Sequence, residues 1–349
     1  MSPNDEEEKR MTANRSWRWL GQGCAALAWL ACGSAQAQFD ATYNGVADFS
    51  YGRFEPSGFR RDYRFNSNSL SASFVGGTVK YGLDGGWTPG ITLEAFVRFQ
   101  DLNGGRNNKD PILSRNAFVF LNNADYGLVR LGRLQTFLFD TTSRFNAMGN
   151  SLPFSPAMRQ LFGSGNIQGV QGDFYWNQAI SYTSPNMQGV TINVMSARGE
   201  RDNPGDLAAA NAVWSRGLFA LAVSVQNVHV NDGIEDPTDE RAWQLGASYN
   251  FGVVRVFGLH TQTRDRGLFA RSKLTSAGLS LPLGPGTVLA QAGYATTSGL
   301  AIDRRHTTIS GGYLYPYDSE TDLYVLGMDD RIKGLTKGGS WVAGVRWRF

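Results

Sequence analysis

From about residue 40 to its end, the sequence alternates between apolar and polar residues almost without interruption. In residues 41–51, for example, Ala, Tyr, Gly, Ala, Phe and Tyr occupy every second position, and polar residues fill most of the places between them. The same pattern returns in residues 91–100, 243–251 and 340–349. Successive side chains of a β-strand point to opposite faces, so a period of two predicts strands with one apolar face. The chain is therefore expected to be all-β.

Counting these segments predicts about sixteen strands. They are expected at 40–51, 68–81, 90–101, 115–122, 127–134, 177–184, 189–198, 207–215, 218–230, 241–250, 253–263, 272–282, 287–297, 305–314, 321–331 and 339–349. Short turns such as 123–125 follow every even strand, and long connections follow every odd one, the longest at 135–176. This regularity is typical of an up-and-down meander, with all long loops on one rim and all tight turns on the other.

A large soluble β-sandwich would also alternate, but two features favour a membrane barrel. Aromatic residues lie near the ends of the predicted strands, as in the interfacial girdles of membrane barrels; examples are Tyr51, Phe99, Tyr249, Tyr315 and Trp341. Many predicted strands also approach the ~9–11 residues of a tilted bilayer crossing, rather than the ~5–6 of globular strands. Because an open sheet edge in lipid would leave backbone groups unpaired, the first and last strands must pair. We therefore predict a transmembrane antiparallel up-and-down β-barrel over residues 38–349, wide enough to admit water.

Composition excludes two other classes. Past the first forty residues, no apolar run approaches the ~18–20 residues of a spanning helix. The net charge is only +3, from 33 basic and 30 acidic side chains, so the basic excess of a nucleic-acid-binding protein is missing. We expect no nucleic-acid partner.

The first 37 residues have the features of a cleaved secretory signal peptide. Arg15 and Arg18 form a basic region, residues 20–31 are mostly apolar, and Ala35-Gln36-Ala37 is a cleavage site of the Ala-x-Ala type. An alternative is a lipoprotein acylated at Cys32. Both cysteines of the chain lie in this segment, so the mature chain would contain no disulfide and no thiolate metal site.

Four segments resemble the general porins of Gram-negative bacteria. They are Tyr43-Asn44-Gly45-Val46-Ala47-Asp48, residues 120–136 with the core Gly127-Leu128-Val129-Arg130-Leu131-Gly132-Arg133, residues 177–189 with the core Tyr182-Thr183-Ser184-Pro185, and the ending Gly344-Val345-Arg346-Trp347-Arg348-Phe349. The resemblance implies a homotrimeric, sixteen-stranded diffusion channel of the outer membrane for ions and small hydrophilic solutes, with the third loop folded into the lumen. One departure is Asn68-Ser69-Leu70-Ser71, where the family usually carries a pore-lining arginine.

In such a channel, selectivity comes from charged side chains that face the lumen near a constriction. Strand parity places six of them on the lumen side: Asp48, Glu94, Arg98, Arg130, Arg346 and Arg348. The connection 135–176 is long enough to narrow the bore, and its acidic candidate is Asp140. Arginines that face an acidic loop would produce a transverse field across the pore.

The main alternative is a substrate-specific uptake channel with a saturable solute site. Phe96, Phe118 and Phe120 would support it, because parity also turns them inward. An outer-membrane hydrolase is disfavoured, since no Gly-x-Ser-x-Gly elbow or His-Glu-x-x-His helix accompanies the three histidines. The acidic run 232–240 could hold a divalent cation, but a solvated loop is the preferred reading. We expect no cofactor and no metal.

The last strand carries a further signal. The terminal Phe349, with Trp347 two positions earlier, resembles the motif by which the outer-membrane assembly machinery recognises barrel precursors. We therefore expect this machinery, outer-membrane lipid and lipopolysaccharide as partners of the chain.

Overall fold

The computed structural model describes residues 39–163, 169–200, 203–230, 238–300 and 302–349. The signal peptide expected at 1–37 and most of the acidic run at 232–240 lie outside these ranges. Residues Ala41–Phe349 form one compact unit.

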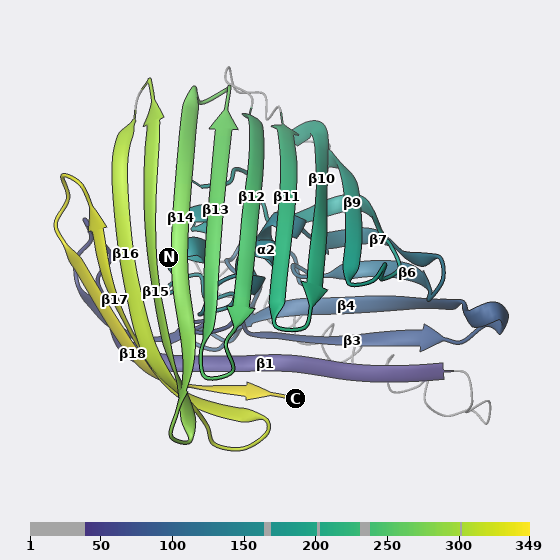
Figure 1. Cartoon of the computed structure of the whole chain (residues 1–349), viewed down its shortest axis with the longest axis horizontal. Helices are drawn as coiled ribbons and strands as arrows, with labels where there is room; N and C mark the ends of the chain where they lie inside the picture. The colour runs from purple at the N-terminus through teal and green to yellow at the C-terminus, as the bar shows by residue number, and fades with distance from the viewer. Residues whose placement is uncertain (1–38, 164–168, 201–202, 231–237, 301) are drawn as a thin grey trace, which may run out of the picture. The chain divides into compact units, whose positions relative to one another are not determined.

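This unit consists of antiparallel strands with two helices in one long connection (Figure 1). The elements are β1 (Phe39–Phe54), β2 (Asp62–Ser67), β3 (Phe74–Tyr81), η1 (Asp84–Gly86), β4 (Thr88–Arg98), β5 (Asn103–Gly104), β6 (Ala117–Asn123), β7 (Gly127–Gln135), α2 (Phe137–Arg144), α3 (Pro156–Phe162), β8 (Tyr175–Thr183), β9 (Val190–Glu200), β10 (Asn203–Arg216), β11 (Phe219–Val230), β12 (Thr238–Asn250), β13 (Arg255–Asp265), β14 (Ala270–Leu283), β15 (Gly286–Gly299), β16 (Asp303–Pro316), β17 (Thr321–Ile332) and β18 (Gly338–Arg348).

The sheet closes on itself to form a barrel. Each wall strand pairs antiparallel with the next along the chain, and β18 pairs with β1 from Val46↔Arg348 to Arg53↔Trp341. The short β2 and β3 both pair with β1 and share one place in the wall, while β5 is a two-residue pairing on β4. The described strands therefore occupy sixteen wall positions, which confirms the predicted class and strand count.

In the barrel wall, apolar side chains face outward and many polar side chains face inward, which is the reverse of a soluble protein. Along β11, Val223 and Val225 are exposed, whereas Ser224 and Gln226 are buried. In β17 the exposed Leu323 and Val325 likewise alternate with inward residues. An apolar outer face and a partly polar inner face suit a surface in contact with lipid around an aqueous interior.

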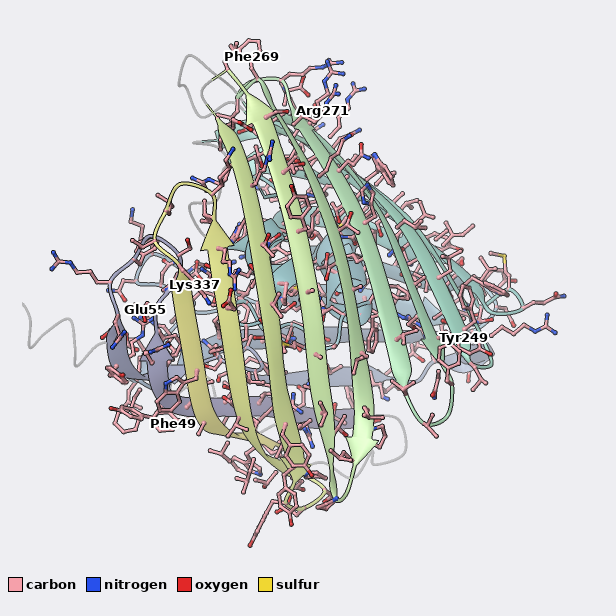
Figure 2. All side chains as sticks on the ribbon, turned by 60° about the vertical axis from the view of Figure 1, so that its left-hand side comes forward. Phe49, Glu55, Tyr249, Phe269, Arg271 and Lys337 are labelled. Carbon is pink, nitrogen blue, oxygen red and sulfur yellow. The ribbon has the colours of Figure 1, made fainter. Side chains whose placement is uncertain are left out.

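Aromatic side chains gather at the rim of short turns, as predicted. Tyr249 and Phe251 contact each other there, with ring centroids 4.5 Å apart, and Trp347 and Phe349 do so at 4.7 Å. Figure 2 places Tyr249 at the opposite end of the barrel from Arg271 and Phe269. Such a belt marks one interface of the bilayer.

The strands begin and end within four residues of their predicted boundaries, with one exception. The strand expected at 68–81 begins only at Phe74, because residues 68–73 leave the sheet and turn inward. The backbone N–H groups of Ser69, Leu70 and Ser71 donate to the Asp48 carboxylate instead of to a neighbouring strand. The strand β2 lies within the connection expected at 52–67. It pairs with β1 and so continues the wall up to the point where residues 68–73 leave it.

The connection between β7 and β8 packs against the inner wall. Helix α2 contacts β10, β11 and β12, and α3 contacts β14, β15 and β16. Glycines make room for it: a Cβ atom on Gly246 would lie 2.6 Å from the Phe145 ring, and one on Gly293 would lie 2.7 Å from Pro156. None of the described helices is long and apolar enough to cross a membrane.

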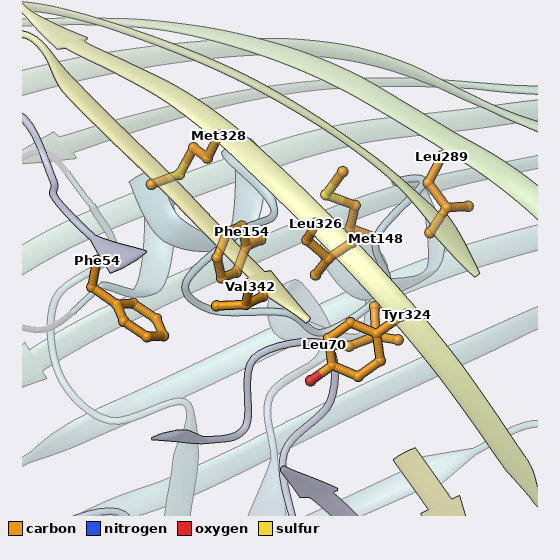
Figure 3. Close-up of a cluster of buried hydrophobic side chains, with 9 residues drawn as sticks. All are labelled: Phe54, Leu70, Met148, Phe154, Leu289, Tyr324, Leu326, Met328 and Val342. Atoms are coloured by element: carbon orange, nitrogen blue, oxygen red, sulfur yellow. The ribbon is translucent and has the colours of Figure 1, made fainter. Parts of the chain in front are cut away.

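Apolar side chains hold this connection in place. Met148 and Phe154 pack with Leu326, Val342 and other buried side chains of the wall (Figure 3). A second cluster forms around Phe145. The inner wall therefore contributes both apolar clusters and polar side chains such as Ser224 and Thr308 to the contact with this connection.

Candidate functional site

The described parts of the connection between β7 and β8, residues 136–163 and 169–174, are bonded to the wall at widely separated strands. The Thr141 and Ser224 hydroxyls are 2.7 Å apart, which ties α2 to β11. The Gln160 amide donates to Thr308 on β16 at 2.9 Å. The Ser151 hydroxyl donates to the carbonyl of Ser69 at 2.5 Å. Because these three contacts hold the segment against the wall, the charged side chains around it define the candidate site.

Asp140 lies in the first turn of α2, where its side chain keeps access to solvent although protein atoms crowd its carboxylate. The Gln135 side-chain amide donates to this carboxylate, and the Tyr175 hydroxyl donates to the Gln135 carbonyl. Burial in the loop raises the pKa of Asp140 to about 6, against the opposing effects of the Gln135 hydrogen bond and the charges of Arg130 and Arg115. The expected acidic residue of the loop is thus present and can change its charge near neutral pH.

Arg130 lies on the lumen face of β7, as parity predicts. Its guanidinium donates to the hydroxyls of Ser181 at 3.1 Å and Thr183 at 3.2 Å, and it lies 6.0 Å from the centre of the Phe118 ring. No carboxylate of the described residues forms an ion pair with it. Its positive charge is therefore held by neutral partners.

Two further arginines are held in the same way. Arg144, in the last turn of α2, donates to the Ser215 hydroxyl at 2.6 Å. Arg255 is the first residue of β13. It donates to the Ser248 hydroxyl at 3.2 Å, and its guanidinium lies 5.1 Å from the Phe257 ring centre. Both side chains are exposed, and neither has a carboxylate partner in the part of the chain that the structure describes.

Glu94 and Arg98 of β4 have ionic partners. Glu94 is buried on the lumen side, where Arg115 and the Asn116 amide donate to it. Arg98 lies 3.3 Å from the Asp101 carboxylate and donates to Asn108 at 2.6 Å. Both pairs balance charge locally.

Arg346 and Arg348 share one carboxylate. Arg346 donates to Asp322 at 2.6 Å and to the Ser71 hydroxyl at 2.9 Å, and Arg348 also donates to Asp322. Asp322 is buried. Because it forms ion pairs with both arginines, its single negative charge compensates part of their combined positive charge.

Asp48 faces inward, but the segment 68–73 covers its carboxylate. In addition to three backbone donors, the Tyr324 hydroxyl donates to it at 2.7 Å. The side chain is fully buried. Its observed contacts are those of an anchor for the inward segment.

A second ionic cluster ties the loop after β4 to the end of the third connection. Arg106 donates to Asp173 at 2.6 Å and to Asp110 at 2.7 Å, and Arg133 donates to Asp173 at 2.7 Å. Burial tends to raise the pKa of Asp173, but the hydrogen bonds and charge of Arg106, together with Arg133, outweigh it and hold the pKa below its usual value. Phe96 and Phe174 lie 5.7 and 5.0 Å from the Arg106 guanidinium.

The C-terminal residues close the barrel. The backbone of Phe349 exchanges hydrogen bonds with Gly45 at 2.8 and 3.2 Å. The Trp347 and Phe349 side chains are 46% and 37% exposed. Gly45 has no side chain and so leaves space for the Phe349 ring, since a Cβ there would lie 2.4 Å from that ring.

Sequence reasoning missed Arg255, Arg115 and Arg106. Parity could have found Arg255, because it shares a face with the inward Ser248 on the neighbouring strand. Arg106 lies in a connection without period two, so no sequence signal placed it. Arg115 was expected to begin a strand but precedes β6, which starts at Ala117, so parity did not indicate its direction.

Comparisons with known proteins agree with this architecture. The family model described as "Gram-negative porin" matches residues 23–334. The chain belongs to this family. Outer membrane porin protein 32 of Delftia acidovorans is 30% identical over 347 residues, which are 92% of this chain and 94% of that protein.

Solved structures share the fold. The anion-selective porin from Comamonas acidovorans is 24% identical with a TM-score of 0.75, over 89% of this chain and 100% of that one. The trimer form of OmpT from Vibrio cholerae is 14% identical with a TM-score of 0.66, over 89% and 99% of the two chains. OmpF of Salmonella typhi, in complex with daunomycin, is 14% identical with a TM-score of 0.64, over 89% and 97%. The porin is thus an outer-membrane diffusion channel and not an enzyme.

Proposed function

We propose that this porin is a passive channel that prefers anions among small hydrophilic solutes. The observation that carries the proposal is the pairing of the lumen charges. Arg130, Arg144 and Arg255 are held by hydroxyl groups, which leave their charge uncompensated. By contrast, Glu94, Asp173 and Asp322 each lie beside an arginine.

The charges close to the path of an ion decide selectivity, because dissolved salt screens electrostatic interactions over longer distances. At physiological ionic strength the Debye length is about 8 Å, so charges farther than this from an ion have little effect on it. The net charge of the chain, +3, is therefore a poor guide, and the three arginines held by hydroxyl groups on the lumen side matter more. Asp140 is the opposing charge among the proposed constriction residues.

The remaining sequence-predicted site residues have smaller roles in this proposal. Arg98, Glu94, Arg346 and Arg348 would shape the wall through their ion pairs, and Asp48 would hold the inward segment. The anion-selective relative from Comamonas acidovorans supports the same sign of selectivity.

A saturable solute site is the second candidate. Arg130 lies over Phe118, whose ring is 6.2 Å from that of Phe120 in an edge-to-face contact. A cation beside aromatic faces could bind an aromatic carboxylate. Conductance that saturates, or block by one such solute at low concentration, would favour this candidate over general diffusion.

The assembly and export of the protein are also proposed. We propose a homotrimer, as OmpT forms in one solved structure, and cleavage of residues 1–37 as a signal peptide. Recognition of Phe349 and Trp347 by the barrel assembly machinery and contact with lipopolysaccharide belong to the same proposal.

Recording from planar bilayers under a salt gradient tests the function. The refolded mature chain should give stepwise conductance in multiples of three that rises linearly with KCl concentration. Its reversal potential should have the sign of chloride permeation. A potential with the sign of potassium permeation would contradict anion preference while leaving the channel itself intact.

A further inference from the structure

A row of polar side chains crosses six neighbouring strands on the inner wall. Its members lie directly opposite one another from β8 to β13 and are, in order, Thr183, Asn193, Asn211, Ser224, Gln244 and Thr261. Ser224 and Gln244 are fully buried, and Asn211 and Thr261 are nearly so. Buried polar groups require hydrogen-bond partners, and this row finds most of them in its own members, in α2 and in Arg130.

A directed chain of hydrogen bonds leads along the row away from Arg130. The Arg130 guanidinium donates to the Thr183 hydroxyl at 3.2 Å, and that hydroxyl donates to the side-chain carbonyl of Asn193 at 2.6 Å. The Asn193 amide donates to the side-chain carbonyl of Asn211 at 2.6 Å, and the Asn211 amide donates to the Thr141 hydroxyl at 3.5 Å. A hydroxyl carries a single hydrogen, so Asn193 takes the hydrogen of Thr183 and leaves its lone pairs for Arg130.

The same row also binds helix α2, which lies against β10, β11 and β12 (Figure 1). The Thr141 and Ser224 hydroxyls are 2.7 Å apart, and the Gln244 amide donates to the Thr142 hydroxyl at 2.7 Å. Asp140 directly precedes these two threonines in the helix. The row therefore fixes the arginine of the wall and the helix that carries the opposing carboxylate relative to each other.

We propose that Asn193 and Asn211 are positioning residues for ion selectivity, because they hold Arg130 in place and away from Asp140. The inference rests on the proposed function, in which these two opposite charges both act on passing ions. The charges of Arg130 and Asp140 interact. Each side chain is nevertheless bonded to neutral partners, the arginine to two hydroxyls and the carboxylate to an amide.

The asparagines act at a distance, since neither donates to or accepts from Arg130. Hydrogen bonds in a chain polarise one another, so the loss of Asn193 also weakens the bond from Arg130 to Thr183. The hydrogen of Thr183 then has no fixed acceptor and competes for the site of the guanidinium. A released Arg130 side chain can turn toward Asp140, and an ion pair between them would cancel the positive charge that an anion meets in the lumen.

A double-mutant cycle on the full mature porin tests the inference, with reversal potentials measured in planar bilayers under a KCl gradient. N193L removes both hydrogen bonds of the asparagine at similar volume, and it should lower the permeability ratio of chloride to potassium about twofold. N211L should act in the same direction. R130Q should lower the ratio at least as much as N193L, and R130Q/N193L should behave like R130Q, because Asn193 acts through the arginine.

The hydroxyl of Thr183 offers a matched pair of variants. T183V has nearly the same shape as the wild type but lacks the hydroxyl, so it should lower the ratio as N193L does. T183S retains the hydroxyl and both of its hydrogen bonds, and it should keep the wild-type ratio. A role in packing alone would not produce this difference. Heat-modifiable mobility identifies the folded barrel for each variant.

The outcomes separate this inference from the proposed function. An equal effect of N193L with and without Arg130 would overturn the inference, and so would an unchanged ratio in folded N193L. A wild-type potential with the sign of potassium permeation would contradict the anion preference, while the cycle would still measure the coupling between Asn193 and Arg130. An R130Q variant with the wild-type ratio would overturn both.

Discussion

Arg144, in the last turn of the helix that packs against β10, β11 and β12, donates a hydrogen bond of 2.6 Å to the hydroxyl of Ser215 on β10. The contact fixes the position of a guanidinium without neutralising it. Because Ser215 is uncharged, the field of Arg144 extends into the lumen water. Hydroxyl groups hold Arg130 and Arg255 in the same way. Under the proposed anion preference, such contacts would let a chain of small net charge present a positive lumen.

Replacing Arg255 by Gln should lower the preference for chloride over potassium about two- to fivefold. One unit charge about 8 Å from an ion in water contributes about 0.5 kcal/mol, with opposite sign for the two ions. The permeability ratio, measured from reversal potentials, checks this. R98Q is the matched control, since Arg98 is already paired with Asp101, and an equal effect of both variants would contradict the assignment.

The anion preference should increase as the pH falls through about 6. The pKa of Asp140 is raised to about 6, so acidification removes its negative charge and leaves the arginines unopposed. D140N should show the acid-form selectivity at all pH values between about 5 and 8. If D140N retains the wild-type pH dependence, another group is responsible.

The ion pairs of Asp173 should stabilise the porin at neutral pH and stop doing so in acid. Its folded-state pKa is lowered, so its contribution is present above the unfolded value of about 3.9 and is lost as the pH falls through the folded one. D173N should therefore melt below the wild type at pH 7, and the two melting temperatures should converge in acid. A constant difference at every pH would argue that the variant acts through packing alone.

Replacing Gly246 by Ala should weaken the packing of the third connection against the wall. The free energy of unfolding should fall by about 1–3 kcal/mol, the usual cost of overpacking. The new Cβ would lie 2.6 Å from the buried Phe145 ring. We expect a lower thermal midpoint and noisier single-channel current. G258A is the control, because nothing lies within 4 Å of a Cβ at that position. Identical behaviour of the two variants would contradict the prediction.

Deleting Phe349 should reduce the yield of heat-modifiable trimer. The residue supplies both the terminal hydrogen bonds to Gly45 and an exposed ring at the rim of short turns. F251A removes another exposed aromatic from the same rim and should assemble normally. Normal assembly of the deletion variant would show that Phe349 is dispensable.

The wall could be predicted from the sequence because lipid imposes period two on every strand. All sixteen expected strands are present, and parity placed Arg130 and Glu94 on the lumen side. The prediction failed at residues 68–73, where local hydrogen bonds to Asp48 compete with the sheet.

The pairing of charges could not be predicted in the same way. Arg98, Arg130 and Arg346 have the same parity, yet only Arg130 forms no ion pair with a carboxylate of the described residues. Their partners come from irregular connections or from neighbouring strands whose register the sequence does not specify. Parity gives the face of a residue, while the register and the loops give its partner.

The most direct test of the central claim compares the wild type with R130Q/R144Q/R255Q in planar bilayers under a KCl gradient. For the wild type we predict a reversal potential with the sign of chloride permeation. For the triple variant it should shift to zero or to the sign of potassium permeation, because the negative charge of Asp140 is then no longer opposed by these three arginines. An unchanged chloride-selective potential in a folded triple variant would contradict the claim that these three uncompensated arginines determine selectivity.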